Sequence, residues 1–273
     1  MTALDQPLPS SLLRHEWLLV CIAAWLAFAS IPVTRGEIGI SWDMLNHHVY
    51  LGWTAEHARF GHDLSGAGSQ SYQFPYLYWP VYKLATSGWS GQWAGATLAT
   101  LCVPAVPAVW LLARLCMPGP TAFDAVMRLL AVVLAFLSVV VLAAFDTTSN
   151  DLMASIPLLW ALALALQPAS AAAPPANART LVMLSGLCAG LSVACKLSNG
   201  PLAILLPALW VFSARGARGR LVNVAVGCGA TAVGFMAAYG YWGALLWHHF
   251  GNPVYPFYDE LFAPLRMRLG WTP

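Results

Sequence analysis

Residues 17–52, WLLVCIAAWLAFASIPVTRGEIGISWDMLNHHVYLG, join a long apolar run to a dense polar cluster. Residues 17–33 carry no charge and, as a helix, approach the roughly 20 residues needed to cross the hydrocarbon core of a membrane. Residues 41–52 then bring together an acid, an amide, two histidines and a tyrosine. This stretch predicts a membrane helix that leads directly into a polar segment at the membrane surface.

Residues 41–52 are predicted to form a helix with one polar face. Asp43, Asn46, His47 and Tyr50 fall at i, i+3, i+4 and i+7, which places them on the same side of an α-helix. Ser41 suits the N-cap, and Asp43 would lie in the first turn, where the helix dipole favours negative charge. Two interpretations remain open: an interfacial helix facing water and headgroups, or one wall of an active site.

The composition predicts an all-α, polytopic membrane helical bundle. Hydrophobic residues make up 59% of the chain and charged residues 9%, whereas soluble domains are about 25% charged. Thirteen tryptophans and nine tyrosines suit a protein with much surface at headgroup level. The net charge of +2 comes from scattered basic residues, which gives no nucleic-acid signature. The six cysteines lack CxxC spacing and are interpreted as small apolar packing residues.

Seven apolar runs are expected to cross the membrane. They lie at about residues 17–33, 93–115, 126–145, 152–166, 180–195, 202–213 and 221–247. We expect residues 1–16 to form a cytoplasmic tail and residues 17–273 a single transmembrane domain. Within that domain, residues 35–92 would form a large external loop carrying short interfacial helices. Residues 248–273 would form an external C-terminal segment.

The basic residues predict which side of the membrane each loop occupies. If the seven runs alternate, one side receives Arg14, Arg114, Arg128, Arg179, Arg215, Arg218 and Arg220. The opposing short links carry only Lys196, so the positive-inside rule places the N-terminus in the cytoplasm. The external side then holds Glu37, Asp43, Glu56, Asp63, Asp146, Asp151, Asp259, Glu260, His47, His48, His57, His62, His248 and His249. Because ionisable groups at membrane depth are functional candidates, this sidedness predicts one external site built from several loops.

Two external segments have both a structural and a functional interpretation. Residues 72–82 interleave aromatics with prolines, which suits either an interfacial aromatic belt or a platform for a sugar ring or prenyl chain. The link from Asp146 to Asp151 holds two carboxylates and three hydroxyl-bearing residues. Ser149 or Asn150 could simply cap the following helix.

Lys196 and the histidines raise the question of phosphate and metal binding. Lys196 separates two short apolar runs and is either a snorkelling interfacial residue or a phosphate partner. Asp43, His47 and His248 are candidate ligands for a divalent metal. No spacing here has the strength of an HExxH or paired CxxC motif, so no cofactor is assigned.

Several of these motifs together resemble bacterial GT-C membrane glycosyltransferases, similar to the dolichyl-phosphate-mannose protein mannosyltransferase families. The likeness is carried by Trp42-Asp43, Tyr72-Gln-Phe-Pro75, Ser149-Asn-Asp151, Lys196-Leu-Ser-Asn199 and Gly251-Asn-Pro-Val-Tyr-Pro-Phe-Tyr258. The resemblance implies a polyprenyl-phosphate-linked sugar as donor and a glycan, lipid or protein as acceptor. It also implies transfer at the periplasmic face of the bacterial inner membrane.

This chain departs from the family pattern in two ways. Many relatives carry an adjacent Asp-Glu pair, whereas Met44 follows Asp43 here. The chain is also shorter than most relatives, and an odd number of spans ending outside indicates a shortened or incomplete chain.

The resemblance places Asp43 in the catalytic centre, and together with the sidedness of the titratable groups it leads to the following expected roles. Asp43 would be the general base that takes the proton of the acceptor hydroxyl, and His47 or His48 would orient it or hold a metal. The predicted substrate-binding residues are Asn46, His48, Tyr50, Arg59, Asp63, Asp146, Asp151, Lys196, Asn199, Asn252 and Tyr255. Lys196 and Arg59 would neutralise the departing polyprenyl phosphate.

Two alternative functions remain open. One is a transporter or flippase for a lipid or glycan, which predicts ionisable groups near mid-span. The interiors of the apolar runs contain almost no charge, which argues against it. The other is a non-catalytic, truncated membrane subunit.

Overall fold

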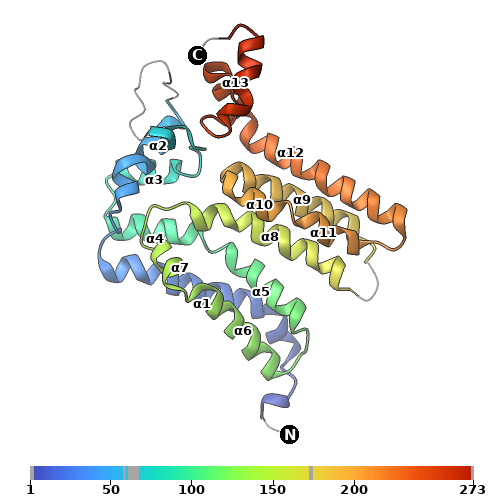
Figure 1. Cartoon of the computed structure of the whole chain (residues 1–273). Coiled ribbons are helices and arrows are strands. Elements are labelled where there is room, and N and C mark those ends of the chain that lie inside the picture. The colour runs from blue at the N-terminus through green and yellow to red at the C-terminus, as the bar shows by residue number, and fades with distance from the viewer. Residues whose placement is uncertain (1–2, 58–59, 61–67, 172–174, 272–273) are drawn as a thin grey trace.

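The computed structural model describes residues 3–57, 60, 68–171 and 175–271 (Figure 1). Over these residues the chain is built from helices, and the only β-type pairing is an isolated bridge between Pro7 and Thr121. The prediction of an all-α fold is therefore confirmed for the part of the chain that the structure describes.

Thirteen α-helices follow one another along the described residues. They are α1 (Ser10–Arg35), α2 (Val49–Thr54), α3 (Trp79–Thr86), α4 (Gly91–Leu101), α5 (Ala105–Cys116), α6 (Ala122–Phe136), α7 (Val139–Ala144), α8 (Asp151–Ser170), α9 (Ala178–Cys195), α10 (Gly200–Ala203), α11 (Leu206–Trp210), α12 (Ala217–Phe250) and α13 (Asp259–Arg268). A π-helical turn covers Met44–His48, and 3-10 turns cover Ala3–Asp5, Gly68–Tyr72, Leu197–Asn199 and Val211–Ser213.

Among the residues that the structure describes, five helical stretches are long and apolar enough to cross a membrane, so the chain is a multi-pass membrane protein. They are α1, the stretch Gly91–Cys116 that contains α4 and α5, α8, α9 and α12. The remaining two of the seven predicted runs form shorter helices. The run at 126–145 breaks after α6, where Ser138 Oγ accepts a hydrogen bond from the Val141 backbone N–H and starts α7. The run at 202–213 is part of a shorter apolar segment, Leu197–Ser213.

The helix boundaries also differ at the N-terminal end. Helix α1 begins at Ser10, before the apolar run that starts at Trp17, so it includes residues assigned to the predicted tail. A left-handed Gly36 ends the helix, and its N–H bonds the Pro32 carbonyl.

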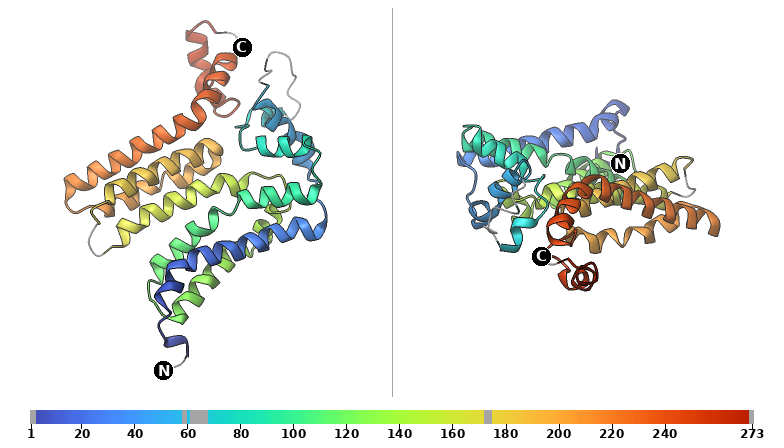
Figure 2. Two further views of the ribbon diagram at one scale, coloured as in Figure 1. Left: turned by 180° about the vertical axis from the view of Figure 1, so that it is seen from behind. Right: turned by 90° about the horizontal axis from the view of Figure 1, so that it is seen from above.

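The long helices form two groups (Figures 1 and 2). Helices α8, α9 and α12 lie side by side, and α1 packs with α4, α5 and α6 on the other side of α8. Helix α5 contacts α8 and so joins the two groups.

Helices α9 and α12 approach closely because glycines face each other's backbone. A Cβ on Gly186 would collide with the Gly227 carbonyl oxygen, and one on Gly190 would collide with the Thr231 carbonyl oxygen. Small residues of this kind let membrane helices pack at short distance. The contact fixes the direction in which α12 leaves the bundle toward the C-terminal segment.

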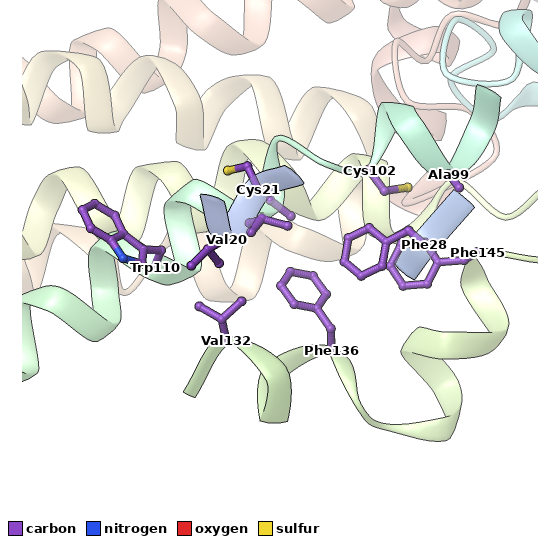
Figure 3. Close-up of a cluster of buried hydrophobic side chains, with 11 residues drawn as sticks. Val20, Cys21, Phe28, Ala99, Cys102, Trp110, Val132, Phe136 and Phe145 are labelled. Atoms are coloured by element: carbon purple, nitrogen blue, oxygen red, sulfur yellow. The ribbon is translucent and has the colours of Figure 1, made fainter. Parts of the chain in front are cut away.

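An aromatic cluster anchors the link that follows α7 (Figure 3). Phe28 of α1 stacks on Phe145 with ring centroids 3.9 Å apart, and Phe136 of α6 tilts against Phe28 at 5.2 Å. Phe145 is buried and directly precedes Asp146. The core therefore positions residues 146–150 against the end of α1.

A buried ion pair ties the start of α1 to α6. Arg128 is 2% exposed and binds Glu16 through Nε–Oε1 at 2.7 Å and Nη2–Oε2 at 2.8 Å. Trp110 Nε1 donates to Glu16 Oε1 at 3.1 Å, and Arg128 Nη1 donates to the Met117 and Gly119 carbonyls at 2.7 and 2.9 Å. The sequence grouped Arg128 with the loop arginines, but its side chain is a fully paired internal residue.

Candidate functional site

Four segments that are distant in sequence meet at one end of the bundle. The Gly39 backbone N–H donates to the Asp146 carbonyl at 2.7 Å, so the first loop lies against the link after α7. The Trp242 indole N–H of α12 donates to the Tyr72 carbonyl at 3.1 Å. Lys196 after α9 forms an ion pair with Asp151 at the start of α8. The predicted gathering of these loops is therefore present in the structure.

The helical segment at residues 41–52 has a different register from the one expected. Ser41 Oγ accepts a hydrogen bond from the Met44 N–H at 3.1 Å, which confirms the predicted N-cap. The following turn is π-helical, and it buries the adjacent residues His47 and His48 to 3% and 5% exposure. The predicted α-helical register is therefore wrong: His47 and His48 point into the protein, while Asp43 stays exposed, although Asp43 and His47 still lie on the same side of the segment.

His48 connects the first loop to the link after α7. Its Nδ1 lies 2.7 Å from Thr148 Oγ1, and its ring stacks on Tyr78 with centroids 4.7 Å apart. Burial, followed by the neighbouring His47, lowers the pKa of His48 to about 4, so the imidazole is neutral near pH 7. His48 is thus a buried structural contact rather than an exposed substrate ligand.

Asp43 and His47 lie close together without a hydrogen bond. Their nearest atoms, Asp43 Oδ1 and His47 Nδ1, are 3.8 Å apart, which is longer than a hydrogen bond allows. Burial lowers the pKa of His47, and the Asp43 charge opposes that shift. The orienting role of His47 therefore stays a prediction. A hydrogen bond between the two side chains would need a small rotation of the exposed Asp43 carboxylate.

Asp43, Asp151 and Lys196 form a charged cluster. Lys196 is held by Asp151, whose other oxygen accepts a hydrogen bond from Ser149 Oγ at 2.8 Å. Burial lowers the pKa of Lys196, and the nearby negative charge of Asp43 opposes this shift. The lysine therefore experiences both carboxylates at once, one in contact and one through space.

Lys196 of this cluster lines a cavity of about 400 Å³, whereas Asp43 and Asp151 are not among its lining residues. Its walls come from the aromatic run, the link after α7, the residues after α9, α12 and the C-terminal segment. The lining residues are Tyr72, Gln73, Phe74, Asn150, Ala194, Cys195, Lys196, Leu197, Ser198, Pro201, Tyr239, Phe257 and Tyr258. The volume falls within the range of small-molecule sites, about 300–1,000 Å³.

Three buried polar atoms near this end have no hydrogen-bond partner among the described residues: His47 Nδ1, Asp146 Oδ1 and Asn150 Oδ1. Asn150 is at the N-cap position of α8, yet its side chain makes no capping hydrogen bond, so the simple capping interpretation is wrong for Asn150. An unpaired buried polar atom costs about 1–3 kcal/mol. This end of the protein therefore keeps unmet hydrogen-bonding capacity that the aromatic and ion-paired regions lack.

Two predicted binding residues instead hold the backbone in place. Asp146 is buried and pairs with Arg35 at 2.7 Å, which fastens the link to the end of α1. The Asn199 amide donates to the Ala154 carbonyl at 3.1 Å and to Ser192 Oγ at 2.8 Å. These contacts, not a substrate, account for both polar side chains, and neither residue lines the cavity.

Asn252 and Tyr255 have similar structural roles in the C-terminal segment. Asn252 is fully buried, and its amide donates to the Phe257 carbonyl at 3.0 Å and to Asp259 Oδ1 at 3.1 Å. Tyr255 stacks on Phe250 with ring centroids 4.2 Å apart. Both residues shape the turn that brings Phe257 to the cavity without lining it themselves.

The remaining predicted residues lie around the first loop. Asn46 Nδ2 donates to Gln70 Oε1 at 3.3 Å, and the Tyr50 ring lies 5.9 Å from that of Trp53. Neither lines the cavity. Arg59 and Asp63 lie outside the described residues.

The proposed metal ligands are not assembled into one site. Asp43 is near His47, but His248 lies in α12 with its ring beside that of His249, centroids 5.1 Å apart. Within the described ranges, no group of three or more His, Cys, Asp or Glu residues is arranged to hold a metal ion.

Several residues that shape the site carry no signal in the sequence. Tyr239 belongs to an apolar span, and only the packing of α12 brings it to the cavity. Tyr78 was one aromatic among many, yet it is 4% exposed and holds His48. In contrast, Tyr72 and Phe74 belong to the segment for which a binding platform was one of the two interpretations.

The fold and this site define a multi-pass helical membrane protein with a charged cluster and a polar-aromatic cavity at one end of its bundle. No protein-family model matches the chain, and searches of curated proteins and of solved structures found no match.

Proposed function

We propose that this protein is a bacterial inner-membrane glycosyltransferase that uses a polyprenyl-phosphate-linked sugar as donor, with its active site at the periplasmic end of the bundle. The observation that carries the proposal is Lys196, which lines the cavity of about 400 Å³, forms an ion pair with Asp151 and lies within electrostatic range of the exposed Asp43. The motif resemblance at Asp43, Asp151 and Lys196 supports it independently of geometry.

The chemistry assigns different tasks to the charged residues. The acceptor hydroxyl oxygen attacks the anomeric carbon, and the bond from that carbon to the phosphate oxygen breaks. The polyprenyl phosphate leaves with the electron pair, and Asp43 takes the acceptor proton. Asp43 suits this task because its carboxylate is exposed and has no hydrogen-bond donor holding it among the described residues. Such general-base catalysis contributes about 10²–10⁴-fold in rate.

Lys196 is the group best placed to meet the departing phosphate. It lines the cavity and is already paired with Asp151, so a donor phosphate would share a cation that the protein holds in position. A preorganised cation stabilises negative charge as it develops on the leaving group. Phe74 and Tyr239 would supply apolar faces to a sugar ring in the same cavity.

The test compares two acids of the first loop. Asp43→Asn removes the proposed base, and Glu56→Gln is the matched control, because Glu56 binds Lys83 and the Trp79 indole rather than the cavity lining. Each purified full chain is reconstituted in lipid nanodiscs and supplied with a panel of polyprenyl-phosphate sugars and with acceptors, and sugar transfer is measured.

We expect wild type and Glu56→Gln to transfer sugar at the same rate and Asp43→Asn to be slower by about 10²–10⁴-fold. Absence of transfer by wild type with every donor would contradict the glycosyltransferase proposal itself. Equal rates for Asp43→Asn and wild type would retain the enzyme class and remove Asp43 as its base.

A further inference from the structure

A second, shallow cavity lies at the opposite end of α9 and α12 from the candidate active site. Its volume is about 570 Å³, and it is lined by Ala176, Ala178, Arg179, Ser213, Ala214, Arg215, Gly219 and Asn223. The first turns of the two helices and the turn that precedes α12 form its walls. We call it the basic groove, because both arginines in its lining are exposed.

The helix starts that border the basic groove carry arginines and no acidic residue. Neither α9 nor α12 has an acidic residue in its first turn; the N-cap Asn177 of α9 makes no side-chain capping hydrogen bond, and the N-cap of α12 is Gly216. Arg179, Arg218 and Arg220 form no salt bridge with any described residue. Arginines beside helix N-termini are electrostatically unfavourable, so an anion bound between them would relieve repulsion as well as gain attraction.

The wall of the groove is fixed before any ligand binds. Asn223 is 4% exposed, and its Nδ2 donates to Ser213 Oγ at 2.8 Å. Ser213 Oγ in turn donates to the Trp210 carbonyl at 2.6 Å. This chain of hydrogen bonds holds the turn that carries Arg215, so the groove is a rigid feature and not a loose loop surface.

The surroundings of the groove indicate a lipid rather than a soluble anion. Helices α9 and α12 are both long and apolar enough to cross a membrane, so their first turns lie at headgroup level. Leu221 and Phe212, next to the groove in sequence, are 71% and 62% exposed and give acyl chains an apolar surface. Basic pockets between membrane helices bind anionic lipid headgroups.

We propose that the basic groove binds the phosphate headgroup of an anionic membrane phospholipid, with Arg179 and Arg215 as its charged contacts. This inference does not depend on the glycosyltransferase proposal, because the groove lies at the other end of the bundle. A lipid bound there would join the start of α9 to the start of α12, next to the glycine contact between these helices.

The test measures lipid retention by the purified full chain with native mass spectrometry. The probes are phosphatidylglycerol, phosphatidylcholine and soluble glycerol 3-phosphate. The double variant Arg179→Gln/Arg215→Gln removes both groove charges from exposed positions, and Arg14→Gln removes an exposed charge near the start of α1, outside the groove. Thermal melting in phosphatidylcholine checks that each variant is folded.

We expect wild type to prefer phosphatidylglycerol, and each groove arginine to be worth about fivefold in its affinity, so that the double variant loses about twenty-five-fold. Arg14→Gln should retain wild-type affinity. Equal loss in Arg14→Gln would show that general surface charge, not the groove, attracts the lipid, and would overturn the proposal. Equally tight binding of glycerol 3-phosphate would overturn the assignment to a membrane lipid.

Discussion

The buried Glu16–Arg128 pair provides the sharpest test of how this bundle is held together. We predict that Glu16→Leu or Arg128→Met alone destabilises the protein by about 3–5 kcal/mol, because each leaves one charge buried without its partner. In the structure the pair makes two direct bonds at 2.7 and 2.8 Å, and the Trp110 indole donates to the glutamate at 3.1 Å. Each single substitution therefore also leaves neutral groups without partners.

The double variant Glu16→Leu/Arg128→Met should be more stable than the sum of the single effects predicts. It buries no unpaired charge, so its main cost is the loss of hydrogen bonds to Trp110, Met117 and Gly119. At about 1 kcal/mol for each neutral bond, the double variant should lose about 3 kcal/mol. The coupling between the two substitutions is then about 3–7 kcal/mol from the same figures.

The assay is equilibrium unfolding of the purified protein in mixed detergent micelles, followed by tryptophan fluorescence. Glu56→Gln is the control, since it breaks an exposed ion pair with Lys83 and should leave the unfolding midpoint unchanged. Single variants as stable as wild type, or a double variant equal to the sum of the singles, would refute the argument that the charges are buried and mutually dependent.

Two further predictions test the helix contact and the buried histidine. Gly190→Ala should lower the free energy of unfolding by about 1–3 kcal/mol, because the new Cβ would collide with the Thr231 carbonyl oxygen. Gly229→Ala is the control and should leave it unchanged, because open space surrounds Gly229. The same unfolding assay compares the two variants. Burial lowers the pKa of His48 to about 4 from 6.5, so the unfolded chain binds a proton first as the pH falls. The contribution of His48 to the free energy of unfolding is therefore present above pH 6.5 and is lost as the pH falls toward 4. At pH 5 this loss amounts to about 2 kcal/mol. The free energy of unfolding of His48→Gln should change less between pH 6.5 and pH 4 than that of wild type. If the variant shows the same pH dependence as wild type, His48 is not the group responsible.

Much of the fold could be predicted from the sequence because a membrane leaves few options for an apolar run. Backbone groups in hydrocarbon must bond within the segment, so long apolar runs become helices. The prediction of span number was less secure, since the run at 126–145 contains a serine that starts a new helix at Ser138. A local side-chain-to-backbone bond competes with helix continuation there, and hydropathy alone does not detect it.

The candidate site could be predicted only in outline. The alternation of spans predicted that Asp43, Asp151 and Lys196 lie at the same end of the bundle, because this placement depends on the order of the spans rather than on detailed contacts. The π-helical turn could not be predicted, since it depends on burying His47 and His48 against Tyr78 and Thr148. These partners come from segments that are distant in sequence. The sequence likewise could not show that Asp146 is buried in an ion pair while Asp151 is exposed, because both positions are aspartates in the same short link.

The location of charge within the bundle separates the transferase proposal from the transporter alternative. A transporter needs ionisable groups that can exchange partners along a path through the spans. In the part of the chain that the structure describes, a buried ion pair joins Glu16, in the first half of α1, to Arg128, in the first half of α6. Five hydrogen bonds hold its two members, so releasing either would leave a buried charge unpaired. That pair is a fixed structural link, whereas Asp43 and Lys196 remain partly exposed at the other end, which favours chemistry at one face over passage through the bundle.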